Sequence, residues 1–252
     1  MELAEADVNS WGVIVNSFEE IEGEYVGALE SNYFNEAKTY CVDHFPSMIN
    51  LIKNCMLSFI KWLDKYVESN QLGSVIYVSY GTQTHLSNDQ MDEIAFELEM
   101  AGPSFHLGCE IEDLGSTDGW TKRVKEEGSV IYDWVEQRSI LAHPSIGGFL
   151  SHCGWNSVLE SLANGVQLLT WPMLDISEQA LNAKLVTMGF GAGLVVLQRD
   201  VESKGVEGRC AKGRKVKERA QELGQLAWHA VEEGGPRMKL DELIERLTNK
   251  NM

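Results

Sequence analysis

Short apolar runs alternate with amphipathic stretches along most of the chain, a pattern typical of an α/β fold. The apolar runs are rich in Val, Ile, Leu or Phe, and the segments predicted as strands are residues 12–16, 74–79, 105–107, 129–134, 148–151, 167–170 and 193–197. The amphipathic stretches repeat apolar positions with helical spacing, and the segments predicted as helices are residues 18–30, 56–68, 87–101, 156–164, 179–188, 216–233 and 240–248. Because strands and helices alternate from residue 74 to residue 197, we expect parallel strands joined by right-handed crossovers.

Local signals indicate where some of these elements begin and end. Ser87 and Gln90 have the spacing of a capping box, which predicts the start of a helix. Gly165 follows the central helix and is typical of a helix C-terminus. Residues 31–54 have no clear period and mix polar with aromatic side chains, which predicts a linker. Residues 108–127 are glycine-rich and charged, which predicts an exposed loop.

The charge of the chain argues against a nucleic-acid partner. Its formal net charge is -17, and phosphate contacts from basic side chains dominate the affinity of nucleic-acid-binding proteins. The basic residues that do cluster lie just before and within the start of one predicted helix, and they are Lys212, Arg214, Lys215, Lys217 and Arg219. We interpret this cluster as a solvated helix face.

The cysteines and the apolar runs predict a cytoplasmic protein without a membrane span. The chain has 5 cysteines, which are scattered and show no metal-ligand spacing, so we expect reduced thiols and no metal site. No apolar run approaches the roughly 20 residues that cross a bilayer. Residues 1–8 are acidic and lack the apolar core of a signal peptide.

The strongest chemical signal follows the apolar run at residues 148–151. His152 and Gly154 precede a predicted helix that opens on Asn156 and Ser157. A helix N-terminus presents backbone N–H groups and positive potential, so this turn suits a diphosphate. The same residue types also make an ordinary helix cap. The spacing alone leaves both interpretations open.

Three side chains near this turn have the chemistry to hold a nucleoside. Glu160 lies one helical turn beyond Asn156 and either accepts hydrogen bonds from a ribose diol or is a solvated helix glutamate. Trp134 ends a predicted strand, where its indole either stacks on a base or joins the core. Gln137 follows three residues later and has the donor and acceptor groups to contact a base edge.

Two further pairs of residues have groups that suit a phosphate or a sugar, and they lie at a strand end or a helix start. Gly81 and Thr82 follow the most apolar predicted strand, where they either approach a phosphate or form a plain turn between strand and helix. Glu178 and Gln179 open a predicted helix. A carboxylate with an amide suits sugar hydroxyls, although a glutamate at a helix start is also a common partner of the helix dipole.

Together and in this order, the residues resemble the plant family 1 UDP-glycosyltransferases. The motifs that carry the resemblance are WGVIVNSFEEIE (residues 11–22), SVIYVSYGTQ (74–83), the stretch 134–179 around GGFLSHCGWNSVLES, and LAWHAVEEGG (226–235). The resemblance implies a GT-B glycosyltransferase fold, of which this chain would be the C-terminal, donor-binding half. Residues 1–54 would be a remnant of the N-terminal acceptor domain with a linker, and residues 55–252 a Rossmann-like domain that binds UDP-sugar.

The same resemblance implies a role for each site residue. Trp134 would stack on uracil, Gln137 would contact the uracil edge, and Glu160 would hold the ribose. The residues that would hold the diphosphate are Thr82, His152, Asn156 and Ser157. The residues that would face the sugar are Trp155, Glu178 and Gln179, and a glutamine at the last position is usual in members that use UDP-glucose.

The implied reaction is inverting transfer of the sugar to a hydroxyl of a small lipophilic acceptor, without a metal or other cofactor. The family's catalytic histidine lies in an N-terminal domain that is almost entirely absent here, so we expect a truncated chain with no catalytic residue. A non-catalytic module that binds UDP or UDP-sugar is the alternative. Glu136 and Gln167 stand where the family usually has proline, and extra residues around 175–177 leave open whether Glu178 and Gln179 reach the sugar or are shifted away from it.

Overall fold

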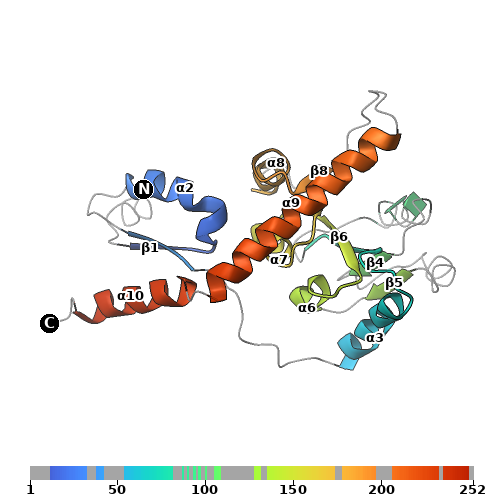
Figure 1. Cartoon of the computed structure of the whole chain (residues 1–252), viewed down its shortest axis with the longest axis horizontal. Helices are drawn as coiled ribbons and strands as arrows, with labels where there is room; N and C mark the ends of the chain where they lie inside the picture. The colour runs from blue at the N-terminus through green and yellow to red at the C-terminus, as the bar shows by residue number, and fades with distance from the viewer. Residues whose placement is uncertain are drawn as a thin grey trace. The chain divides into compact units, whose positions relative to one another are not determined.

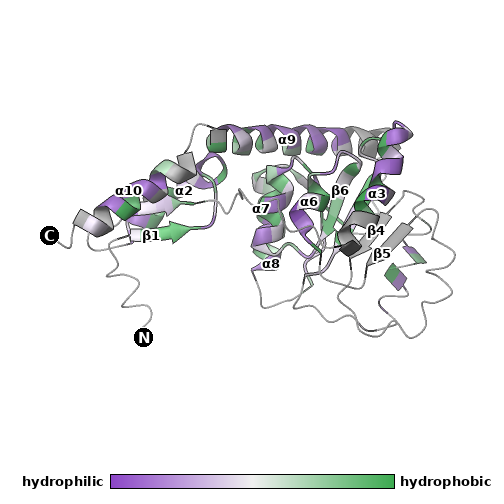
Figure 2. Cartoon of the chain, turned by 90° about the horizontal axis from the view of Figure 1, so that it is seen from below, coloured by the Kyte–Doolittle hydropathy of each residue, from purple (hydrophilic) through white to green (hydrophobic). Residues whose placement is uncertain are grey.

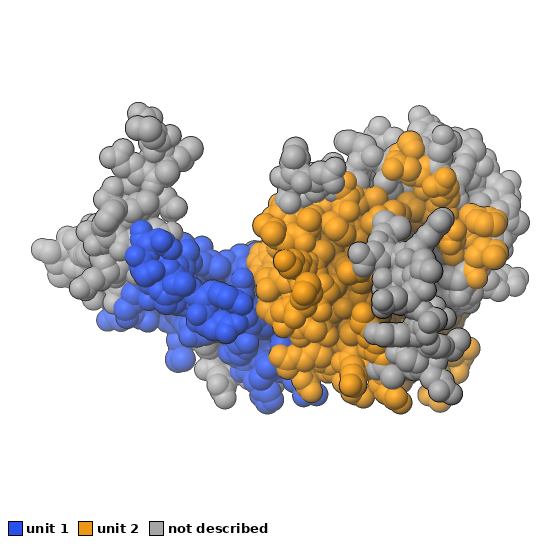
Figure 3. Space-filling model, turned by 90° about the horizontal axis from the view of Figure 1, so that it is seen from above, with its two compact units in different colours: residues 1–48, 223–252 blue, residues 49–222 orange. Residues whose placement is uncertain are grey.

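The structure is a computed structural model, and its described residues fall into two compact units. It describes residues 12–32, 38–42, 54–81, 87, 90, 93–94, 96–97, 100, 105–108, 128–131, 135–173, 178–196, 206–232 and 235–249. Unit 1 comprises residues 1–48 and 223–252, and unit 2 comprises residues 49–222 (Figure 3). Residues 223–252 therefore belong to the same unit as residues 1–48. The division into domains at residues 1–54 and 55–252 stays a prediction.

Unit 2 contains a six-stranded sheet in which all neighbouring strands are parallel (Figure 1). In spatial order its strands are β5 (Gly128–Ile131), β4 (Phe105–Gly108), β3 (Val75–Ser79), β6 (Ile146–Ser151), β7 (Leu168–Thr170) and β8 (Gly193–Val195). Counted from the first strand of this unit, the order is 3-2-1-4-5-6, which is the order of doubly wound dinucleotide-binding folds. The predicted parallel α/β sheet is confirmed.

The helices of unit 2 agree with the prediction in part. They are α3 (Asn54–Glu68), α6 (Gln137–Leu141), α7 (Trp155–Ala163), α8 (Gln179–Lys184), the π-helix η2 (Leu185–Gly189) and the first part of α9 (Val206–Glu232). The sequence did not predict α6, and α9 begins at Val206 rather than at residue 216. Ser87 and Gln90 exchange hydrogen bonds of 3.0 and 3.3 Å between side chains and backbone N–H groups, which confirms the capping box.

The core of unit 2 lies against the central strands. Tyr77 of β3 and Phe149 of β6 are register partners and stack with ring centroids 4.9 Å apart. Other fully buried side chains of this unit are Leu63, Ile140, Leu141, Leu162 and Leu168. Parallel strands are covered on both faces, which explains why five of the six residues of β6 are buried; the apolar residues of the strand are green in Figure 2. Gln167, at the expected proline, donates from Nε2 to the Gly147 carbonyl at 2.9 Å and so binds the neighbouring strand.

Unit 1 combines a small parallel sheet with helices. Its elements are β1 (Gly12–Val15), β2 (Lys38–Cys41), α2 (Glu19–Glu30), α10 (Gly235–Asn249) and the end of α9 from Leu223. The strand β2 lies inside the segment predicted as a linker, so that prediction is wrong for residues 38–41. Two ion pairs, Lys38–Glu242 and Lys239–Glu19, join α10 to β2 and α2.

Candidate functional site

The candidate site lies where the strand order of the sheet reverses. β3 and β6 are neighbours, although β4 and β5 separate them in the chain. Their register pairs Ser79 with Ser151, so the turns that follow both strands lie at the same carboxyl edge. In doubly wound sheets, ligands bind in the crevice outside this edge at such a switch point.

The helix α7 begins at this edge without a capping side chain. Its N-cap is Gly154, and no side chain makes a cap hydrogen bond there. The interpretation of Asn156 or Ser157 as an ordinary N-cap is therefore wrong, because both lie inside the first turn of the helix. The N-terminus of α7 thus presents backbone N–H groups and positive potential at the switch point.

The imidazole of His152 is held between two glycines. A Cβ atom added to Gly81 would lie 2.6 Å from Nε2 of His152, and one added to Gly154 would lie 2.5 Å from it. Gly81 has a φ of 73°, a conformation that favours glycine, whereas Gly154 has an ordinary φ of -59°. At Gly154 the volume of the imidazole alone therefore excludes a side chain.

The burial of His152 also sets its charge. Burial lowers the pKa of His152 below 6.5, while a backbone hydrogen bond with Ser79 and the charge of Glu178 oppose that shift. The ring is therefore neutral at pH 7. Its Nδ1 atom is buried and has no hydrogen-bond partner within the described part of the chain. A buried polar atom without a partner, at the carboxyl edge of a sheet, is a mark of a ligand site.

Cys153, the next residue, has a left-handed backbone conformation that residues other than glycine rarely adopt. Its φ is 66°, and three contacts hold it there. The Ser151 hydroxyl accepts its N–H at 3.1 Å, Asn182 of α8 donates from Nδ2 to its carbonyl at 3.0 Å, and its own thiol donates to the Ser151 carbonyl at 3.5 Å. Strained residues that neighbours hold in place cluster at functional turns. Asn182 therefore ties α8 to the turn that carries His152.

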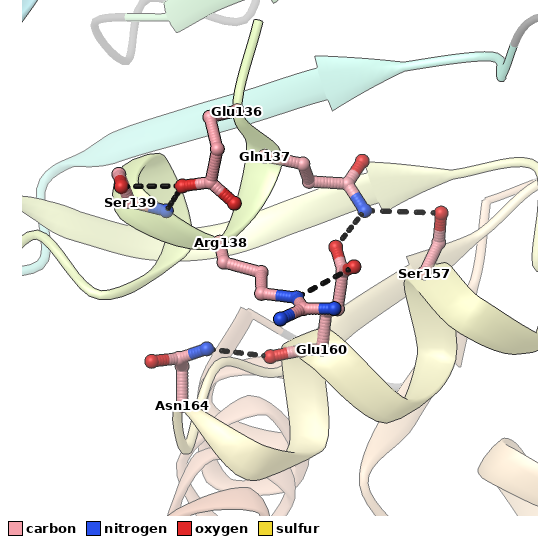
Figure 4. A network of polar contacts seen from close by, with 7 residues as sticks. All are labelled: Glu136, Gln137, Arg138, Ser139, Ser157, Glu160 and Asn164. Atoms are coloured by element: carbon pink, nitrogen blue, oxygen red, sulfur yellow. Dashed lines mark hydrogen bonds and ion pairs between the residues drawn. The ribbon is translucent and has the colours of Figure 1, made fainter. Parts of the chain in front are cut away.

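A polar network joins α6 to α7 beside this turn (Figure 4). Gln137 donates from Nε2 to the Ser157 hydroxyl at 3.2 Å and to Oε2 of Glu160 at 2.6 Å. Arg138 donates from Nε to Oε1 of Glu160 at 3.1 Å. Because a carboxylate only accepts hydrogen bonds, the amide nitrogen of Gln137 must face Glu160. The network fixes the Glu160 carboxylate from two sides.

Glu136 explains how the chain tolerates the loss of the expected proline. It is the N-cap of α6, and its carboxylate accepts the Ser139 N–H at 2.8 Å and also the Ser139 hydroxyl. A side-chain cap satisfies a donor at the helix start and so stabilises a short helix. The cap fixes the beginning of α6, from which Gln137 and Arg138 reach α7.

The start of α8 lies beside the same turn. The Oε1 atom of Gln179 accepts the Met173 N–H at 3.0 Å, and its side chain is buried. Glu178 is exposed, and its charge acts on the titration of His152. Residues 174–177 lie outside the described residues, yet α8 remains next to the turn.

The predicted site residues that the structure brings to this edge are Gln137, His152, Trp155, Asn156, Ser157, Glu160, Glu178 and Gln179. Thr82 and Trp134 lie outside the described residues. Arg138 and Asn182 also contact this site, although the sequence did not predict them. The spacing of Asn182, three residues after Gln179 on a predicted helix, was a usable signal. Arg138 gave none, because α6 itself was not predicted.

A second group of residues combines Ser, His and Asp as a hydrolytic triad does, but its serine is buried and a substrate cannot reach it. His143 contacts the Ser145 hydroxyl through Nδ1 at 2.8 Å and Asp64 through Nε2 at 3.2 Å. Ser145 is fully buried, and its backbone N–H also donates to Nδ1 at 3.3 Å. A nucleophile must reach its substrate, so this set instead ties α3 to the start of β6.

The described residues contain neither a metal-binding cluster nor a membrane-spanning helix. Within these residues no three or more His, Cys, Asp or Glu side chains are grouped so that they could hold a metal ion. None of the described helices has the length and apolar character needed to cross a membrane.

The doubly wound sheet and the polar site at its switch point define an α/β domain of the nucleotide-binding class. The sequence model of the family described as UDP-glucoronosyl and UDP-glucosyl transferase matches residues 55–213. The chain therefore belongs to this family.

Relatives and solved structures are similar to this chain over nearly its whole length. UDP-glycosyltransferase 90A1 of Arabidopsis thaliana is 38% identical over 240 residues, which cover 92% of this chain and 48% of the relative. The structure of Medicago truncatula UGT71G1 complexed with UDP-glucose has a TM-score of 0.77 at 30% identity, over 98% of this chain and 56% of that one. The structure of Glycyrrhiza uralensis UGT73P12 complexed with glycyrrhetinic acid 3-O-monoglucuronide has a TM-score of 0.79 at 28% identity. This match covers 98% of this chain and 55% of that one. These structures confirm the predicted GT-B fold class, and the chain spans about half the length of the curated relatives it matches.

Proposed function

We propose that this chain binds UDP-glucose at the switch point of its sheet and supplies the donor side of a glycosyl transfer. The observation that carries the proposal is the convergence of the α7 N-terminus, the clamped His152 and the Gln137–Glu160 pair at one carboxyl edge. The complex of Medicago truncatula UGT71G1 with UDP-glucose supports the same ligand here.

The proposed contacts to UDP follow from the chemistry of each group. The N–H groups of α7, with His152, Asn156, Ser157 and Thr82, hold the diphosphate, since donors and positive helix potential offset its charge. Glu160 accepts hydrogen bonds from the ribose hydroxyls, Trp134 stacks on uracil, and Gln137 contacts the edge of the base. We expect no metal, because these donors perform the task that a cation would otherwise perform.

The proposed contacts to the sugar come from Trp155, Glu178 and Gln179. In the transfer step, an acceptor hydroxyl oxygen attacks the anomeric carbon, the bond to the diphosphate oxygen breaks, and UDP leaves with the electron pair. The hydroxyl proton passes to a general base, which must lie within hydrogen-bond reach of the acceptor. We assign that base to no described residue. Glycyrrhetinic acid 3-O-monoglucuronide in the Glycyrrhiza uralensis complex supports a small lipophilic acceptor.

A second candidate function is a module that binds UDP or UDP-sugar without transferring the sugar. It is favoured by the donor groups that converge at the switch point, since no described residue among them is assigned as the general base. We place either function in the cytosol, since the described cysteines Cys41 and Cys153 are free thiols, as in reducing compartments.

Titration calorimetry with UDP, UDP-glucose and ADP-glucose tests the proposal. We expect saturable binding of both uridine ligands and binding of ADP-glucose that is weaker by about tenfold or more. His152→Ala is expected to weaken UDP binding, whereas His229→Ala, at an exposed position of α9, leaves it unchanged. Unaltered protein that does not bind UDP contradicts the proposal.

A glucosylation assay with small lipophilic alcohols and phenols separates the two candidates. Transfer of glucose by the chain alone supports the enzyme and places the base within this sequence. Binding of UDP-glucose without transfer supports the module.

A further inference from the structure

Arg138 makes an ion pair with Glu160 inside the candidate site. Its Nε atom lies 3.1 Å from Oε1 of Glu160, and the two side chains are 23% and 20% exposed. Figure 4 shows Arg138 reaching from α6 to the carboxylate on α7, next to Gln137. A pair that is mostly shielded from water holds its geometry better than an exposed pair does.

We infer that Arg138 is a positioning residue, which holds the Glu160 carboxylate in the orientation that accepts the ribose hydroxyls of UDP. This inference rests on the proposed function. Arg138 acts through Glu160 and needs no contact of its own with the ligand.

The hydrogen-bond capacity of the carboxylate fits this role. An ionised carboxylate has two oxygens with about four lone-pair sites. Arg138 occupies one site on Oε1, and Gln137 occupies one on Oε2. One site remains on each oxygen, and the ribose diol has one hydroxyl to offer to each. The pair therefore orients Glu160 without using up its capacity for the ligand.

The two contacts also restrict the side chain before the ligand arrives. Gln137 alone restrains one oxygen and leaves the carboxylate free to turn about its last side-chain bond. The charge-assisted bond from Arg138 fixes the second oxygen and hence the plane of the group. Fixing a binding group in advance removes part of the ordering cost from the binding step.

The test compares UDP with 2′-deoxy-UDP, which lacks one ribose hydroxyl, by titration calorimetry on the full chain. The unaltered protein is expected to prefer UDP. In Arg138→Met the dissociation constant for UDP should rise about tenfold, while that for 2′-deoxy-UDP, which keeps one hydroxyl for Glu160, should rise less, about threefold. A loss of general structure would weaken both ligands alike, so the selective loss identifies positioning.

Two further variants serve as controls for Arg138→Met. Arg219→Gln removes an Arg–Glu pair on α9 and a hydrogen bond to the Phe190 carbonyl, neither of which belongs to the candidate site, and it should leave the preference for UDP unchanged. Glu160→Gln should abolish the preference, and adding Arg138→Met to it should have no further effect on the ratio of the two constants. Should Arg138→Met fail to fold by circular dichroism, Arg138→Gln takes its place.

Two outcomes are distinct. If the unaltered protein does not bind UDP, the proposed function falls, and this inference falls with it. If it binds UDP and Arg138→Met keeps the full preference over 2′-deoxy-UDP, only the role of Arg138 is overturned.

Discussion

The two units of this chain contain parallel sheets of different size and coverage. In unit 2 the central strands β3 and β6 each have neighbours on both sides, and their paired side chains Tyr77 and Phe149 are 1% and 0% exposed. In unit 1 the sheet has two strands, and Ile14 in the middle of β1 is 59% exposed. Tyr25 on α2 of the same unit is 51% exposed.

This difference shows where the fold places both its stability and its candidate site. Parallel strands are stable when both faces are covered, and isolated two-stranded sheets are marginal. Unit 2 meets that condition, and its carboxyl edge can hold His152 and Glu160 in fixed positions. The described sheet of unit 1 has two strands and leaves Ile14 exposed on one of them. We therefore expect substitutions in the two units to have unequal effects.

The largest effect is expected in the core of unit 2. Phe149→Ala removes a fully buried ring that stacks on Tyr77, and it should lower the free energy of unfolding by about 3–5 kcal/mol. Ile14→Ala in unit 1 should change it by less than about 0.5 kcal/mol, because that side chain is mostly exposed. Urea denaturation followed by circular dichroism measures both. Equal losses would break the comparison.

Replacing glycine by alanine should weaken UDP binding at Gly154 but stabilise the fold at Gly27. Gly154→Ala places a Cβ atom against the His152 ring, and UDP affinity should fall between about tenfold and a hundredfold. Gly27→Ala, inside helix α2 of unit 1 with no atom within 4 Å of the added Cβ, should raise stability by about 1 kcal/mol and leave UDP binding unchanged. Calorimetry and thermal melting of the two variants test this pair. A Gly154→Ala protein that binds UDP normally would show that the glycine does not position His152.

Thiol labelling compares the opening of the two units directly. Burial raises the pKa of Cys41 in unit 1, and burial raises the pKa of Cys153 in unit 2 to about 12. Because the thiolate is the reactive form, both thiols should react slowly with iodoacetamide at pH 8 and faster as the pH rises. With Cys55, Cys109 and Cys210 replaced by Ser, we expect Cys41 to be labelled about tenfold faster, since a less covered unit opens more readily. Mass spectrometry gives both rates, and faster labelling of Cys153 would contradict the ranking.

The sequence predicted the parts of the fold that local signals determine. Alternating strands and helices, the capping box at Ser87 and the helix end at Gly165 were all correct. It missed α6 because five residues make fewer than two helical turns and so cannot show a repeat, and the helix depends on its cap by Glu136. It missed β2 because four residues, with Lys38 at their start, give too short an apolar run.

The candidate site divides in the same way. Residues close together in the central motif, such as His152, Ser157 and Glu160, were found because one turn and one helix carry them. Arg138 and Asn182 act through contacts with residues that lie 22 and 29 positions away in the chain. Such contacts depend on how α6 and α8 pack beside α7, which no local pattern encodes.

The smallest effect is expected for the ion pairs of unit 1. Lys38 of β2 lies 3.5 Å from Glu242 of α10, and the two side chains are 51% and 48% exposed. Water and salt screen such a pair, so Lys38→Met should lower the free energy of unfolding by less than about 0.5 kcal/mol. Arg138→Met breaks a pair of unit 2 that is less than one quarter exposed, and it should cost more. Urea denaturation at low salt and at 1 M salt separates the two, because only the small effect of Lys38→Met should vanish at high salt. A larger loss for Lys38→Met than for Arg138→Met would mean that exposed charges, rather than buried contacts, hold this chain together.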